Sequence, residues 1–203
     1  MDIRFHFDRP VSQLELRVED NSLCILSGLG KLLKKIRLHN NGRRILLKAN
    51  SSICRTTSRE NIGGFNATYC TKLDLTTFES LNLEARKKYL LNWCIDNVEA
   101  AMNSFLSDGL TSEVALILHT FRDTCNFSSQ FNGKWNQIDN QRARVVIFQK
   151  FEKADVHIES KIYRSRTSQL SPILVQTRPS VFIFQKHLKP PILTAKGDWG
   201  LAE

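Results

Sequence analysis

Two segments with strand-like alternation place a histidine near a carboxylate, the pair from which a general base is built. His6 stands two residues before Asp8, and His157 stands two residues before Glu159. Because side chains two apart project from one face of a strand, each pair could share a proton. A charged outer sheet face with cross-strand ion pairs explains the same residues without chemistry. An enzyme whose site joins these distant residues is therefore the third of three hypotheses.

Basic residues gather in two further segments and are the more informative feature. Alternation on either side of Asn40-Asn41-Gly42 puts one basic set on the polar side of a predicted hairpin. A second set lies on one side of a later strand, with Lys161, Arg164 and Arg166 close behind it in sequence. Such rows of cations bind phosphates or carboxylates. The predicted partner-binding residues are Lys35, Arg37, Arg44, Lys48, Arg142, Arg144 and Lys150.

The type of partner depends on the aromatic residues near these basic faces. Sheets that bind nucleic acid usually expose aromatic side chains on which bases stack. Alternation puts Phe5, Phe7 and Phe151 on the apolar side of their strands and turns only Tyr163 outward. The favoured hypothesis is therefore a non-enzymatic protein-binding module. It would occlude an acidic protein partner, a toxin or an enzyme, as an inhibitor or immunity-type protein does. Nucleic-acid binding by the same faces is the alternative.

The candidate phosphate-loop, metal and cysteine motifs lack the residue spacing that their chemistry requires. The segment Ser27-Gly28-Leu29-Gly30-Lys31 has Ile25 and Leu32 where a phosphate loop needs Gly and Ser or Thr, which favours a turn between strands. The five histidines have no second His or Cys at a metal-ligand spacing, so no local metal site and no cofactor are expected. The five cysteines, Cys54 beside Arg55 among them, form neither a disulfide framework nor a known nucleophile motif. They are interpreted as reduced, mostly buried thiols of a cytoplasmic protein.

The order of the expected elements predicts an α+β fold. Alternation predicts strands around 3–7 and 14–18, an apolar stretch at 23–26, a hairpin with arms at 36–38 and 45–47, and a strand at 67–75. Helical periodicity predicts an antiparallel pair of helices over 82–107 and 111–125. Strands are expected again at 143–151, 156–163, 172–176 and 181–185, after a polar loop at 126–140. One or two antiparallel sheets, built from the N- and C-terminal strands, would pack against the central helix hairpin.

Length and charge limit the domain organisation and the kinds of partner that the sequence allows. The chain has 203 residues and a formal net charge of +9, which favours acidic partners. A single domain over 1–189 with an irregular tail at 190–203 is expected, and a boundary near residue 130 is the alternative. The longest apolar run has five residues, so no membrane span is expected, and the amino terminus does not resemble a secretory signal. The sequence does not determine the oligomeric state.

Overall fold

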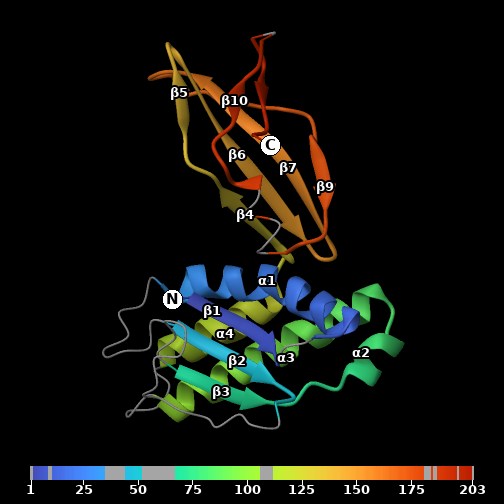
Figure 1. The fold of residues 1–203 in the computed structure, drawn as a ribbon. Helices are drawn as coiled ribbons and strands as arrows, with labels where there is room; N and C mark the ends of the chain where they lie inside the picture. The colour runs from blue at the N-terminus through green and yellow to red at the C-terminus, as the bar shows by residue number, and fades with distance from the viewer. Residues whose placement is uncertain are drawn as a thin grey trace. The chain divides into compact units, whose positions relative to one another are not determined.

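The computed structural model describes residues 2–8, 11–34, 44–51, 67–105, 112–180, 184, 187–195 and 197–202. The protein is α+β, as predicted, and its contacts gather into two compact units, Met1–Phe127 and Ser128–Glu203 (Figure 1). The division falls near residue 130, where the sequence offers an alternative boundary. A single domain over residues 1–189 stays a prediction.

The first unit contains a three-stranded parallel sheet in the order β1-β2-β3. Its strands are β1 (Asp2–Phe7), β2 (Arg44–Ala49) and β3 (Ala67–Thr71). The expectation of antiparallel pairing is wrong here, because a 21-residue helix connects β1 to β2 and returns the chain to the end at which β1 began. The hairpin predicted about Asn40-Asn41-Gly42 has its turn outside the described residues, and β2 is paired on both sides by β1 and β3.

The helix that replaces the predicted strand at 14–18 and the apolar stretch at 23–26 is α1 (Gln13–Leu33). A capping box begins it: the Glu15 N–H donates to Ser12 Oγ at 3.2 Å, and the Ser12 N–H donates to Glu15 Oε2 at 2.7 Å. Val18, Ile25 and Leu29 then fall on one buried face at helical spacing. Burial of one face of a 21-residue helix stabilises this segment more than the short alternation at 14–18 favours a strand.

The predicted helix pair is confirmed as α3 (Leu83–Phe105) and α4 (Ser112–Thr124), preceded by the short α2 (Leu75–Ser80). Figure 1 shows α3 and α4 behind the parallel sheet, and α3 contacts β2, β3 and α1. The glycine segment at 27–31 lies inside α1 and forms no turn. A Cβ at Gly28 would lie 3.2 Å from the Phe121 ring of α4, so glycine permits the close approach. Among the helices that the structure describes, none combines the length and apolar character needed to cross a membrane.

The second unit is a six-stranded antiparallel sheet. Its central strands are β6 (Gln141–Lys150) and β7 (Lys153–Ile162). The strands β4 (Ser128–Asn132) and β5 (Asn136–Ile138) pair with β6, while β8 (Gln169–Leu170) and β9 (Val175–Thr177) pair with β7. The polar loop expected at 126–140 is therefore mostly strand.

The core of the second unit lies on the sheet face that carries Val145, Ile147, Val156 and Ile158, all buried. The ring of Phe184 packs 5.0 Å from that of Phe131. A strand at 181–185 was expected, but Phe184 is helical and its N–H donates to Ser180 O at 2.8 Å; the neighbouring residues lie outside the described part. The tail is not wholly irregular, because β10 (Ile192–Leu193) pairs antiparallel with β11 (Trp199–Gly200).

Candidate functional site

The outer face of the β6–β7 pair is the strongest candidate site. The antiparallel register sets Arg142 opposite Lys161 and Arg144 opposite Glu159, so these four side chains share one face. Toward the other end, Lys150 lies opposite Lys153, and Asp155 lies opposite Phe148. The face therefore carries five cationic and two acidic residues among those described: Arg142, Arg144, Lys150, Lys153 and Lys161, with Asp155 and Glu159.

Trp135 lies over the cationic end of this face. It sits in the three-residue break between β4 and β5, which both pair with β6 and so hold it close to that strand. The Gly133 N–H donates to Val145 O at 2.8 Å, and a Cβ at Gly133 would lie 3.1 Å from Leu188 O. A Cβ here would be closer than most real Cβ contacts, so glycine favours this close backbone approach two residues before the tryptophan.

Three cations contact the Trp135 ring. The Arg142 and Arg144 Cζ atoms lie 4.5 and 4.7 Å from the ring centroid, and Lys161 Nζ lies 5.1 Å from it. All are within the range of cation–π attraction, which is about 0.5–1 kcal/mol at exposed sites and more where water is excluded. We call Trp135, Arg142, Arg144 and Lys161 the cation cluster. The ring holds like charges together that would otherwise repel one another.

Glu159 neutralises one of these charges. Arg144 Nε donates to Glu159 Oε2 at 2.6 Å, and Ser168 Oγ donates to Glu159 Oε1 at 2.6 Å. Burial alone would raise the pKa of Glu159, but the hydrogen bonds from Ser168 and Arg144 and the charges of Arg144 and Lys161 lower it below its ordinary value. Glu159 is therefore an ionised structural partner, and this disfavours its use as a general base.

Arg142 and Lys161 differ from Arg144 in having no ion-pair partner among the described carboxylates. Arg142 Nε is also buried without a hydrogen-bond acceptor in the described part of the chain. Both side chains are half-buried, so water screens their charges less than those of fully exposed residues. The cation cluster thus carries three cations and has one carboxylate, Glu159, beside it, so an external anion would be attracted to it.

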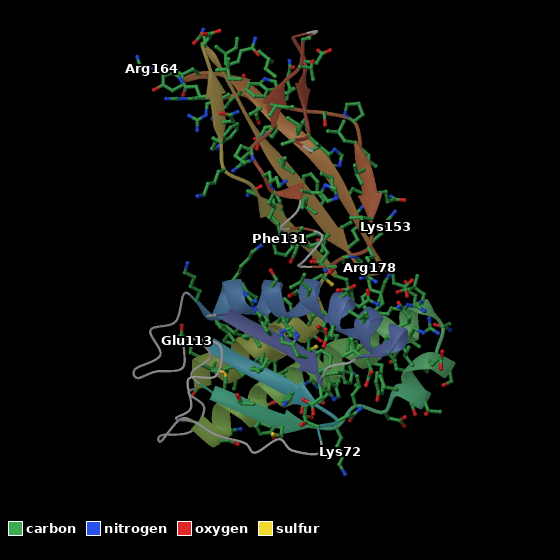
Figure 2. All side chains as sticks on the ribbon, viewed as in Figure 1. Lys72, Glu113, Phe131, Lys153, Arg164 and Arg178 are labelled. Carbon is green, nitrogen blue, oxygen red and sulfur yellow. The ribbon has the colours of Figure 1, made fainter. Side chains whose placement is uncertain are left out.

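The opposite end of the face has a different character. Lys150 is 56% exposed, and its Nζ lies 3.9 Å from Asp155 Oδ2. His157 donates from Nδ1 to Ser171 O at 2.9 Å, and its ring meets Phe148 edge-on at 5.3 Å. Figure 2 shows Lys153 and Arg164 near opposite ends of the unit, so the basic residues extend along the length of β7.

The first predicted basic set falls mostly outside what the structure describes. Lys35 and Arg37 lie outside the described residues, and of Arg44 only the backbone in β2 is described. Lys48 Nζ lies 2.6 Å from Asp8 Oδ1. The hydrogen bonds from Lys48 and from Ser51 lower the pKa of Asp8. The seven predicted contact residues are thus divided between the two units, and their role as partner contacts stays a prediction.

The four residues of the enzyme hypothesis are divided between the two units, and the hypothesis stays a prediction. His6 Nδ1 lies 3.6 Å from Glu19 Oε1, and that oxygen accepts the Phe7 N–H at 2.6 Å. His6 and Asp8 belong to the first unit, whereas His157 and Glu159 belong to the second. Each of the four has a structural contact of its own within its unit.

The cysteines are partly at odds with the expectation of five reduced thiols. Cys70 is disulfide-bonded, whereas Cys24, Cys94 and Cys125 are free. Burial raises the pKa of Cys24 to about 12, with a smaller effect from nearby Cys125, and burial also raises the pKa of Cys94 and Cys125. Such thiols are poor nucleophiles at neutral pH. Cys54 lies outside the described residues.

Within the described part of the chain, no group of three or more His, Cys, Asp or Glu side chains is arranged to hold a metal ion. No family model, curated protein or solved structure matches this chain. Function must therefore be argued from the site itself.

Sequence reasoning found the arginines of the cation cluster and missed its aromatic member. Trp135 stands in a stretch interpreted as a polar loop. The sequence does contain a signal for a hairpin here. Asp139-Asn140 is a dipeptide typical of turns, and it lies between Asn136-Gln137-Ile138 and a long predicted strand. Recognising that hairpin would have placed Trp135 beside Arg144.

Proposed function

We propose that the outer face of β6 and β7 binds an acidic segment of a protein partner and occludes it, in the manner of an inhibitor or immunity-type protein. The observation that carries this proposal is that Arg142 and Lys161, which form no ion pair among the described residues, are both held on the ring of Trp135. A preformed cationic surface loses little conformational entropy on binding and raises the association rate with acidic partners.

The chemistry of the cluster fits a protein carboxylate. Tryptophan and arginine are the residues most enriched where interfaces bind tightly. Arg144 already binds one carboxylate, that of Glu159, at 2.6 Å. A partner Asp or Glu would make the same kind of contact with the neighbouring Arg142.

Nucleic-acid binding is the second candidate, favoured by one specific observation. Trp135 is an aromatic side chain among cations on a sheet, the combination used to bind single strands. However, three cations already contact this ring, which leaves less of it for a base to stack on. We therefore rank this candidate below protein binding.

Affinity capture from a lysate of the source, with and without nuclease, tests the proposal. The bait is the tagged full chain, eluted by a salt gradient and analysed by mass spectrometry. We expect one stoichiometric acidic protein that survives nuclease, and at least about tenfold weaker capture by the double variant Arg142→Gln/Lys150→Gln.

The matched control is Lys72→Gln/Lys88→Gln, which removes the same charge from exposed positions of the first unit. Equal loss in both double variants would show a general charge effect and contradict a local site. Capture of nucleic acid, with affinity falling steeply between about 50 and 200 mM salt, would transfer the proposal to the second candidate.

A cytoplasmic location belongs to the same proposal. Three free thiols support it, since oxidising compartments promote disulfides. The disulfide at Cys70 argues in the other direction. Alkylation of the protein in freshly lysed source cells distinguishes the two, because a cytoplasmic chain would be largely reduced at Cys70.

A further inference from the structure

A polar pocket lies on the sheet of the second unit, on the face opposite the cation cluster. The register sets Gln141 opposite Ile162 and Ser160 opposite Gln169, and alternation puts all four side chains on the face that carries the buried core. These residues line a cavity of about 270 Å³ at the end of β7. The pocket is therefore separate from the surface proposed for the acidic partner, and its assignment does not depend on that function.

The turn that follows β7 supplies the rest of the wall. The Tyr163 N–H donates to Asn140 O at 2.8 Å, and the Ser165 N–H donates to Ile162 O at 2.9 Å. The Thr167 N–H donates to Ser165 Oγ at 3.2 Å, and the Ser165 and Thr167 hydroxyl oxygens lie 3.0 Å apart. Both of these residues line the pocket. Because these bonds fix the turn, its hydroxyls are in place before a ligand binds, which lowers the entropy cost of binding.

Three side chains of the pocket are available for hydrogen bonds to a ligand. Among the described residues, none forms a hydrogen bond with the side chain of Gln141, Ser160 or Gln169. Each carboxamide offers two N–H donors and an acceptor oxygen, and the serine hydroxyl both donates and accepts. Ser160 is half-buried, and both glutamines are exposed.

The lining disfavours anions and nucleobases. Lys161 also borders the cavity, but its side chain lies on the other face with its Nζ 5.1 Å from the Trp135 ring. The other described residues of the lining carry no charge, so a phosphate or a carboxylate would find no cationic side chain there. None of the described lining residues is aromatic, and nucleobases usually stack on aromatic rings. An uncharged ligand with several hydroxyl groups matches this lining.

We propose that this pocket binds one pyranose ring of a carbohydrate through Gln141, Ser160 and Gln169. Neighbouring hydroxyls of such a ring donate to a carboxamide oxygen and accept from its nitrogen at the same time. Ile162, which is 61% exposed, offers an apolar surface to the C–H groups of the ring. The cavity is smaller than the ~300–1,000 Å³ usual for small-molecule sites, so it suits a single ring.

The test is an NMR titration of the full-length protein with the methyl α-pyranosides of glucose, galactose and mannose. We expect at least one of them to give saturable shifts of the Gln141, Ser160 and Gln169 amide signals. The dissociation constant should be on the order of 1 mM, as the small number of ligand atoms allows. Tetrahydropyran, which has the same ring without hydroxyls, should give no saturable shifts.

A free monosaccharide and one unit of a glycan share this chemistry, and a further titration separates them. It uses the 1,4-linked disaccharide of whichever sugar binds. Tighter binding of the disaccharide than of the methyl pyranoside would assign the pocket to a glycan chain. Equal or weaker binding would assign it to a single sugar.

Three variants locate the site. Gln141→Ala and Gln169→Ala each remove hydrogen bonds and should weaken binding about three- to tenfold. Ser160→Tyr should fill the cavity and abolish binding. The matched control is Gln137→Ala, an exposed glutamine of β5 that lies opposite Arg142 on the other face, and it should leave the affinity unchanged.

The proposal would be overturned by any of three results. These are the absence of saturable binding by all three pyranosides, equal binding of tetrahydropyran, and an equal loss of affinity in Gln137→Ala. Because both glutamines of the pocket are exposed, their replacement by alanine should preserve the fold and keeps the test valid if Ser160→Tyr does not fold.

Discussion

At the scale of single residues, Glu159 connects the candidate site to the stability of the fold. Its pKa is lowered, so its ionised form stabilises the fold above the ordinary pKa of 4.5, and that stabilisation is lost as the pH falls through the lowered value. We expect Glu159→Gln to reduce the free energy of unfolding by about 1 kcal/mol at pH 7. The difference between wild type and variant should shrink as the pH falls below about 4.5.

Urea unfolding of both proteins from pH 7 to pH 3 measures this difference. Asp198→Asn, at an exposed position of the same unit, is the control and should lower stability by less than about 0.5 kcal/mol. A loss in Glu159→Gln that stays constant across this pH range would show that the ion pair with Arg144 is not its source.

Strand alternation predicts some residues of the candidate site and not others. Alternation correctly places Arg142 and Arg144 on one face of a strand, because that depends on one strand alone. The partners of those arginines depend on the register with β7 and on the break between β4 and β5. Strand alternation therefore predicts neither the ion pair of Glu159 with Arg144 nor the position of Trp135 over the arginines, since cross-strand register is a tertiary property.

At the scale of elements, the start of α1 decides the fold of the first unit. Ser12 and Glu15 satisfy two backbone N–H groups that the first helical turn leaves free. We expect Ser12→Ala to lower the free energy of unfolding by about 1 kcal/mol, and Ser12→Gly by only a few tenths. Guanidinium unfolding followed by circular dichroism at 222 nm measures both.

Ser80→Ala is the comparison, since Ser80 Oγ only donates to a carbonyl one turn back, Thr77 O. Its effect should be smaller than that of Ser12→Ala. Equal stability of Ser12→Ala and wild type would mean that packing of Val18, Ile25 and Leu29 alone fixes the helix.

The elements were predictable where one periodicity extends over a long segment. Both α3 and α4 follow their helical spacing, and β6 and β7 follow their alternation. The segment at 14–18 alternates too briefly to exclude a helix, and the interpretation as a strand then made an antiparallel sheet the natural expectation. Once α1 is a helix between β1 and β2, parallel pairing follows from the connection.

At the scale of the whole molecule, each unit has a buried core built from its own elements. Leu118 lies in the core of the first unit, 1% exposed, and Ile147 lies in that of the second, fully buried. Replacing either by alanine removes buried methyl groups and leaves a cavity, at a cost of about 2–5 kcal/mol. If the cores are energetically separate, each substitution should destabilise only its own unit.

Hydrogen exchange read by mass spectrometry in a series of denaturant concentrations separates the two cases. With separate cores, Leu118→Ala accelerates exchange in peptides from α3 and leaves those from β6 and β7 unchanged, and Ile147→Ala does the reverse. Acceleration of both sets by either variant would instead show one cooperative domain, as the sequence predicts for residues 1–189. Separate cores would also mean that the second unit keeps the cation cluster in register when the first unit opens. Partner binding would then survive Leu118→Ala and be lost in Ile147→Ala.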